Sequence, residues 1–161
     1  MPIEIDFENA SNFDAPNEQD CLTWVQSALA GHKDQATVSI RIVDSTESQQ
    51  LNRDYRGKDK PTNVLSFPFD APPGVPEEAF DYMLGDLVVC APIVIEEAQT
   101  QNKEIRHHWC HLLVHGTLHL LGFDHIKDEE AETMEQMERD ILATLGVPDP
   151  YLDTSRGLTK S

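Results

Sequence analysis

The sequence predicts an α+β fold, a single domain in which a small four-stranded mixed sheet packs against about five helices. The chain of 161 residues has the length of one domain and can bury one core. Four short segments have the residue types of strands, and several longer segments have apolar residues at helical spacing. The chain has no internal repeat. We therefore expect one domain over residues 1–146, followed by a flexible C-terminal tail over residues 147–161.

The four predicted strands are recognised by alternation and by β-branched side chains. Residues 3–7 alternate apolar and polar side chains, and residues 37–43 are rich in valine and isoleucine. Residues 63–69 form the third strand and residues 85–90 the fourth. Pro68 cannot donate to a hydrogen-bond ladder, so the third strand is expected at an edge of the sheet or at a bulge.

The predicted helices begin and end at recognisable signals. They cover residues 18–30, residues 44–55, a segment opened by Pro92, residues 105–121 and residues 127–145. The second begins with a capping-box pattern, Asp44 followed by Glu47, and ends at Gly57. The last has Met134, Met137, Ile141 and Leu145 at core spacing, a stripe typical of packing rather than of a cofactor site.

The charge of the chain is strongly negative but unevenly distributed. A net charge of −17 argues against a nucleic-acid partner, because phosphates are bound by basic surface. Four of the 12 basic residues nevertheless fall within eight positions: Arg53, Arg56, Lys58 and Lys60. This segment is either a local phosphate-binding patch or an ordinary solvated helix end.

The three cysteines indicate the compartment. Cys21, Cys90 and Cys110 are odd in number, widely spaced and free of any C-x-x-C pattern, so a disulfide framework is not expected. The first residues do not resemble a secretion signal, and no apolar run reaches the roughly 18 residues needed to span a bilayer. We expect a cytoplasmic protein without a membrane partner.

A cluster of histidines late in the chain predicts a metal site. His115 and His119 are four residues apart, so on a helix they share one face about one turn, ~5.4 Å, from each other. Gly122 can end the helix with a positive φ and turn the chain, which would bring His125 back towards the same ion. Three neutral imidazoles with a fourth position left open are typical of catalytic zinc.

Other residues near this cluster have competing interpretations. His111 lies one turn before His115 but further from the bend, so it is interpreted as a supporting or packing residue. His107 and His108 are expected at the surface. Asp124 is an alternative ligand, or it orients a ligating imidazole.

The residue after the first histidine argues against a peptidase. Zinc peptidases with this histidine spacing have a glutamate there as general base, whereas this chain has Gly116. A peptidase would need a base from elsewhere, for instance Asp86 or Glu104. Phosphodiester cleavage needs charge stabilisation and an activated nucleophile, and zinc lowers the pKa of a bound water towards ~7 without a carboxylate. Gly116 is also expected to leave room for a nucleotide.

Two separate motifs resemble those of one family, the YbeY proteins, which are bacterial endoribonucleases and ribosomal RNA maturation factors. Residues 115–125 resemble its H-G-x-L-H-L-x-G-(Y/F)-D-H motif, and residues 55–68 resemble its Y-R-x-x-(D/x)-x-P-T-(D/N)-V-L-S-F-P signature. Residues 85–87 resemble a shorter G-D-(I/L) signature. The similarity extends from the first strand to about residue 146. Asn63 stands where many relatives have aspartate, which bears on substrate preference.

The resemblance implies a hydrolase that prefers single-stranded RNA, with one zinc ion per chain held by His115, His119 and His125. It also implies an arginine in the cleft, which corresponds to Arg56. Independently of the resemblance, this guanidinium can bind two phosphate oxygens, and the neighbouring Lys58 and Lys60 can hold flanking phosphates. The implied roles are 16S ribosomal RNA 3′-end maturation and ribosome quality control. The implied partners are ribosomal RNA, the small ribosomal subunit and its assembly factors. DNA is not expected as a partner. A non-catalytic ribosome-assembly factor with structural zinc is the alternative.

Overall fold

The computed structural model describes residues 3–69, 73–74, 83–123 and 128–150, and within them it contains four strands and five helices. The elements follow one another as β1 (Ile3–Asn9), α1 (Glu18–Leu29), β2 (Ala36–Val43), α2 (Ser45–Arg56), β3 (Val64–Pro68), β4 (Met83–Cys90), α3 (Ala91–Thr100), α4 (Ile105–Leu120) and α5 (Asp128–Thr144). The predicted α+β fold with a four-stranded sheet and five helices is confirmed.

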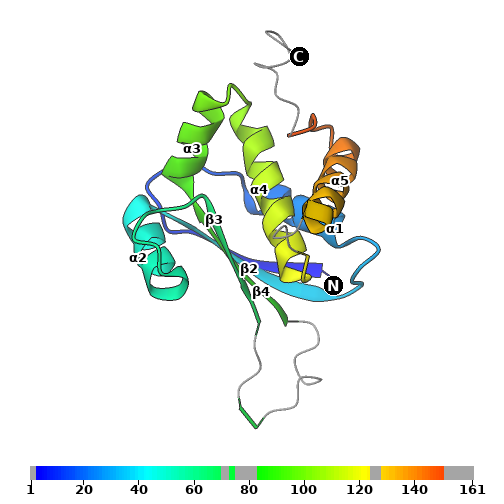
Figure 1. Ribbon diagram of the computed structural model, residues 1–161, viewed down its shortest axis with the longest axis horizontal. Coiled ribbons are helices and arrows are strands. Elements are labelled where there is room, and N and C mark those ends of the chain that lie inside the picture. Colours follow the sequence, from blue (N-terminus) through cyan, green and yellow to red (C-terminus); the bar gives the residue numbers. More distant parts are fainter. Residues whose placement is uncertain (1–2, 70–72, 75–82, 124–127, 151–161) are drawn as a thin grey trace.

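The four strands form one mixed sheet in the order β1-β2-β4-β3 (Figure 1). β2 pairs in parallel with both β1 and β4, whereas β3 runs antiparallel to β4. β3 is therefore an edge strand, as Pro68 predicted, and Pro68 is its last residue, opposite Gly85.

Alternation along the strands divides the apolar side chains between two clusters. The larger core contains Ile40 and Ile42 of β2 with Leu87 and Val89 of β4, and it continues into α1, α4 and α5. The intervening residues, among them Val88, belong to a smaller cluster that packs with Leu51 of α2 and Ile93 of α3. Because successive side chains of a strand point to opposite faces, α4 and α2 cover different faces of the sheet.

α2 begins and ends where the sequence predicted, but its capping box is absent. Asp44 makes no side-chain hydrogen bond to the first turn of the helix, and its carboxylate instead accepts from the backbone N–H of Asn12. Glu47 is held by Arg41, with N–O distances of 2.7 and 2.9 Å, so it does not reach back to the helix start. At the other end, Gly57 has φ 72° and ends the helix as expected.

α4 crosses the centre of the molecule and contacts the sheet as well as α1, α3 and α5 (Figure 1). Ten of its 16 residues are buried. It ends as predicted at Gly122, whose φ of 104° turns the chain. The N–H groups of Leu121 and Phe123 both donate to the carbonyl of Leu118, one of the last carbonyls of the helix. The residues that follow, 124–127, lie outside the described residues, and so do His125 and Asp124.

α5 packs against the core as its apolar spacing predicted, and residues after it also contact the rest of the protein. In α5, Met134 is buried, and Met137, Ile141 and Leu145 pack against the main core, which confirms the predicted packing stripe. Beyond α5, Val147 contacts the core and Lys103 donates to the carbonyl of Pro150. Residues 151–161 lie outside the described residues.

Two features of the structure relate to the expected compartment: the state of the cysteines and the length and hydropathy of the helices. Cys21, Cys90 and Cys110 are all free and buried. Burial raises the pKa of the Cys21 and Cys110 thiols to about 12, so both are protonated at neutral pH. Within the described part of the chain, no helix is both long and apolar enough to cross a membrane.

Candidate metal and phosphate-binding site

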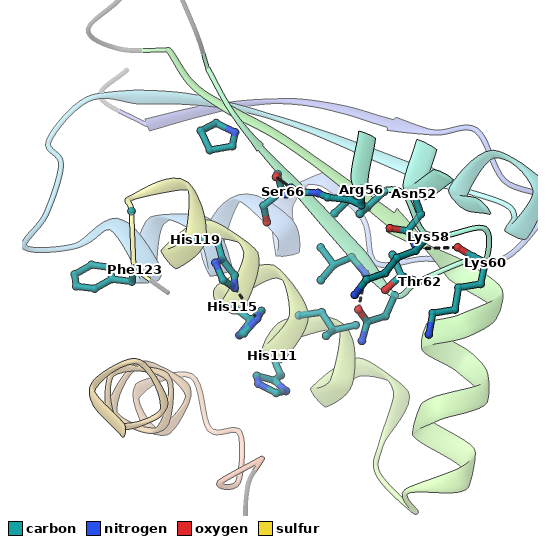
Figure 2. A pocket seen from close by; sticks show the side chains of 16 residues that line it. Asn52, Arg56, Lys58, Lys60, Thr62, Ser66, His111, His115, His119 and Phe123 are labelled. Carbon is teal, nitrogen blue, oxygen red and sulfur yellow. Dashed lines mark hydrogen bonds between the residues drawn. The ribbon is translucent and has the colours of Figure 1, made fainter. Parts of the chain in front are cut away.

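A cavity of about 920 Å³ lies between the end of α2, the loop after it, β3 and the C-terminal half of α4. Figure 2 shows His111, His115 and His119 in a row along α4 on one side, and Arg56, Lys58 and Lys60 on the other. The cavity thus brings two separate motifs of the sequence, residues 55–68 and the histidine helix, to the same place.

His115 and His119 point their rings at one another. Their Nε2 atoms are 3.1 Å apart, and the ring centroids are separated by 4.6 Å. Two nitrogens bound to one tetrahedral zinc ion, each at about 2.0–2.1 Å, would be about 3.4 Å apart. The pair therefore fits a single metal ion with little movement. His125, the third predicted ligand, lies outside the described residues.

Behind His115 lies a carboxylate from another helix. Glu138 of α5 is 0% exposed, and its two oxygens contact two histidines of α4. One is 2.6 Å from Nδ1 of His115 and the other is 2.9 Å from Nε2 of His111. An acidic side chain with this degree of burial must be paired, because an isolated charge is too costly to remove from water.

His111, His115 and Glu138 form a group that could hold a metal ion. One ligand atom from each lies within 4.8 Å of the others. Burial lowers the pKa of His111 below the ordinary imidazole value of 6.5, and the neighbouring Glu138 only partly opposes this effect. His111 is thus neutral at neutral pH and available either as a ligand or as a hydrogen-bond donor.

Arg56 is held at the rim of the cavity by the edge strand. Its Nη2 donates to the backbone carbonyl of Ser66 over 2.6 Å, and the guanidinium lies 5.5 Å from the ring centroid of Phe67. The hydroxyl of Ser66 in turn donates to the carbonyl of Gly116 in α4. β3 therefore connects the arginine to the histidine helix. The side chain remains exposed, so other guanidinium N–H groups are open to a ligand.

The loop with the two lysines is anchored by α2. Asn52 and Ser48 are almost completely buried, although both are polar. Asn52 donates to the carbonyl of Lys60, and the hydroxyl of Ser48 donates to the carbonyl of Thr62. These bonds fix the loop while Lys58 and Lys60 remain exposed and line the cavity.

The fourth basic residue of this segment lies apart from the cavity. Arg53 pairs with Asp54 at the surface and is not among the residues that line the cavity. Three of the four clustered basic side chains therefore face the histidines.

The expected role of Gly116 as room for a nucleotide is wrong. Gly116 is buried on the face of α4 that meets the sheet, and it does not line the cavity. A Cβ atom at this position would be 2.8 Å from Cδ2 of Leu87 and 3.3 Å from Oγ of Ser66. The glycine therefore allows α4 to approach β3 and β4 closely, and a glutamate would not fit there.

The expectation that His108 lies at the surface is also wrong. It is 4% exposed, and its Nε2 lies 2.9 Å from the carboxylate of Glu97 in α3. Asn63 donates to the same carboxylate. Burial raises the pKa of Glu97, but the hydrogen bonds from His108 and Asn63 together outweigh it, so the net pKa lies below its ordinary 4.5.

Glu138 was not among the predicted site residues, although its place in the sequence is unusual for a glutamate. Glu138 follows Met134 by four residues on the face of α5 that carries the packing stripe, so it is a charged residue within an apolar face. Buried charges are rare unless they are paired. A glutamate at such a position therefore indicates a partner inside the protein.

The two residues considered as substitute peptidase bases lie elsewhere. Asp86 alternates with Leu87 on β4, so it points to the face of the sheet opposite α4. Glu104 is the N-cap of α4, about three turns from His115, and is near His107 instead. Neither lines the cavity.

A family profile and a relative that match this chain have the same description. The profile of the family described as Endoribonuclease YbeY matches residues 5–146. A protein of Halorhodospira halophila named Endoribonuclease YbeY is 53% identical over 149 residues, which cover 92% of this chain and 96% of that protein. The solution structure of TM1509 from Thermotoga maritima has a similar fold, with a TM-score of 0.55 at 24% identity, over 92% of this chain and 98% of that one.

Proposed function

Because this chain belongs to the Endoribonuclease YbeY family, we propose that it is a zinc-dependent endoribonuclease that cleaves single-stranded RNA. The observation that carries the proposal is the cavity between α2 and α4. One side of it has two histidines with converging nitrogens, and the other side has three exposed basic side chains. A metal site facing a phosphate-binding site can supply both the activated nucleophile and the charge stabilisation that phosphodiester cleavage needs.

The chain's own groups have distinct roles in this proposal. Arg56, oriented by the carbonyl of Ser66, binds the scissile phosphate and stabilises the charge that develops on it. Lys58 and Lys60 bind flanking phosphates, because they lie on the same rim and are exposed. A base-paired duplex is stiffer and wider than one strand, so a cavity bounded by α2, the loop after it, β3 and α4 favours a flexible single strand.

His115, His119 and His125 would hold the metal. Neutral imidazoles are ligands that zinc favours, and a bound zinc ion would supply Lewis-acid stabilisation and activation of the nucleophile. The 3.1 Å separation of the His115 and His119 nitrogens supports this assignment for two of the three. We take His111 and Glu138 as neighbours of the site rather than ligands, because Glu138 contacts His115 at Nδ1, whereas His119 faces the other ring nitrogen, Nε2.

The proposed substrate in the cell is ribosomal RNA. We assign the enzyme to maturation of the 16S 3′ end and to ribosome quality control, where it would act with the small ribosomal subunit and its assembly factors. We place it in the cytoplasm, in keeping with three cysteines that are free and buried. One basic rim on a chain of net charge −17 favours a local contact with RNA over general adhesion to nucleic acid.

Cleavage of a single-stranded RNA oligonucleotide by the purified protein tests the proposal. A chelator should abolish cleavage, added Zn²⁺ should restore it, and a matched hairpin should be cut more slowly. Arg56→Ala serves as the variant with an altered phosphate site. RNA binding without any turnover by the zinc-loaded protein would contradict the enzyme and favour a non-catalytic assembly factor.

A peptidase activity is the remote alternative, and the position of Gly116 against Leu87 argues against it. Digestion of casein by the zinc-loaded protein, absent from a His115→Ala control, would contradict this conclusion.

A further inference from the structure

Glu138 is a buried charged residue at the site to which the proposed reaction gives no role. It reaches α4 from α5, 23 residues further along the chain than His115. Its side chain is 1% exposed, and the carboxylate contacts Nδ1 of His115 at 2.6 Å and Nε2 of His111 at 2.9 Å. A packing residue at this position of the α5 stripe would be apolar, so the carboxylate needs another explanation.

The contact with His115 selects one tautomer of the ring. An ionised carboxylate only accepts hydrogen bonds, so Nδ1 of His115 carries the proton that Glu138 accepts. The neutral ring then has its lone pair on Nε2, the atom that faces Nε2 of His119 over 3.1 Å. The carboxylate thus directs the lone pair to the side of the ring where a metal would be held.

The same carboxylate supplies a negative charge where little water screens it. A divalent ion held by neutral imidazoles has no anion among its protein ligands, and charge interactions are strong in a buried environment. Coordination through Nε2 would also draw electron density from the ring and make Nδ1–H a better donor. The bond between His115 and Glu138 would then strengthen on metal binding, as in carboxylate–histidine–zinc arrangements generally.

We propose that Glu138 is a positioning residue: it holds His115 in the Nδ1–H tautomer and provides the counter-charge for the bound metal. His111 is the second donor that keeps the carboxylate in place. This inference rests on the proposed metal site, and it extends that site to a residue of α5 that is not a ligand.

The test compares the zinc affinity of wild-type protein and Glu138→Gln. Glutamine retains the shape but removes the charge. Titration of metal-free protein with Zn²⁺ against a chromophoric chelator should show about 10- to 100-fold weaker binding, the scale for loss of such a partner. Glu97→Gln is the matched control, because it alters the corresponding contact with His108 at the other end of α4. Its zinc affinity should equal that of the wild type.

Two further measurements separate positioning from a purely structural role. A structural role would lower the melting temperature of metal-free and zinc-loaded protein equally, whereas a positioning role reduces the rise in melting temperature that zinc produces. Nitrogen NMR of the metal-free wild type should find His115 in the Nδ1–H tautomer. That measurement needs no variant, so it decides the matter even if Glu138→Gln does not fold.

Three results would overturn the inference. The first is an unchanged zinc affinity in Glu138→Gln, and the second is an Nε2–H tautomer of His115 in the wild type. The third is zinc binding that is lost in Glu138→Gln and His111→Ala but kept in His119→Ala, which would make Glu138 a direct ligand. A wild-type protein that neither binds zinc nor cleaves RNA would instead contradict the proposed function itself.

Discussion

Two carboxylates from neighbouring helices contact histidines of α4, and the two pairs differ in what lies beyond the imidazole. Glu97 of α3 pairs with His108, whose other nitrogen, Nδ1, is buried and has no hydrogen-bond partner among the described residues. Glu138 of α5 pairs with His115, whose other nitrogen faces His119 and the cavity. The Glu97 side chain is 31% exposed, whereas that of Glu138 is 1% exposed.

The difference shows how one kind of contact serves two purposes. At the first turn of α4, the Glu97–His108 pair fastens α3 and the start of β3 to the helix, since Asn63 shares the carboxylate. About two turns later, the Glu138–His115 pair fastens α5 and also orients a nitrogen towards the candidate metal site. We infer that the structural pair can be altered at a cost in stability alone, and the other cannot.

The largest expected effect is the loss of the metal. His119→Ala should lose the single zinc ion and all RNA cleavage, because two of three ligands cannot retain a catalytic zinc. His108→Ala should retain about one zinc per chain and lose only stability. Elemental analysis of the purified variants measures both, and His125→Ala should behave like His119→Ala. Removal of the metal by His111→Ala but not by His125→Ala would contradict the ligand assignment.

The next effect concerns the basic side of the cavity. Arg56→Ala should keep its zinc and melting temperature, but RNA cleavage should fall by about two orders of magnitude or more, the scale for loss of a transition-state donor. Arg56→Lys should rescue little, because an ammonium cannot reproduce the two-pronged contact. Single-turnover kinetics measures the loss. Lys58→Ala should weaken RNA binding only modestly and in a salt-dependent way. Cleavage by Arg56→Ala at the wild-type rate would leave the arginine as surface.

Gly116 permits α4, the helix that contains both histidines, to pack closely on the sheet. Gly116→Ala should destabilise the protein by about 1–3 kcal/mol, the usual cost of overpacking, because its Cβ would be 2.8 Å from Leu87. Urea unfolding of the metal-free protein measures this cost. A variant as stable as the wild type would show that α4 can shift away from the sheet without penalty.

The smallest expected effect is a pH dependence of the stability that the Glu97–His108 pair contributes. The pKa of Glu97 in the folded protein lies below its ordinary 4.5, so its stabilising contribution is fully present above that value and is lost as the pH falls through the lowered pKa. The difference in free energy of unfolding between wild type and Glu97→Gln should therefore be constant near neutral pH and shrink in acid. Denaturant unfolding across about pH 3–7, the range set by this linkage, measures it. A difference that grows in acid would contradict the assigned direction.

Local sequence was enough to predict the elements and one part of the site. Alternation and helical spacing identified the four strands and five helices of the described residues. Pro68 indicated that β3 lies at an edge or a bulge, and Gly57 and Gly122 marked two helix ends. The approach of His115 to His119 also follows from local geometry, because residues four apart share one face of any helix. These features depend on neighbours within a few residues.

Only the tertiary structure decided which distant side chains meet. Glu138 contacts His115 because α5 packs on α4, and Arg56 faces the histidines because β3 joins the far edge of the sheet. Gly116 was expected to leave room for a nucleotide, yet it lies where α4 packs closely against Leu87 of β4. Contacts of this kind depend on how whole elements pack, and the spacing of residues along the chain does not contain that information.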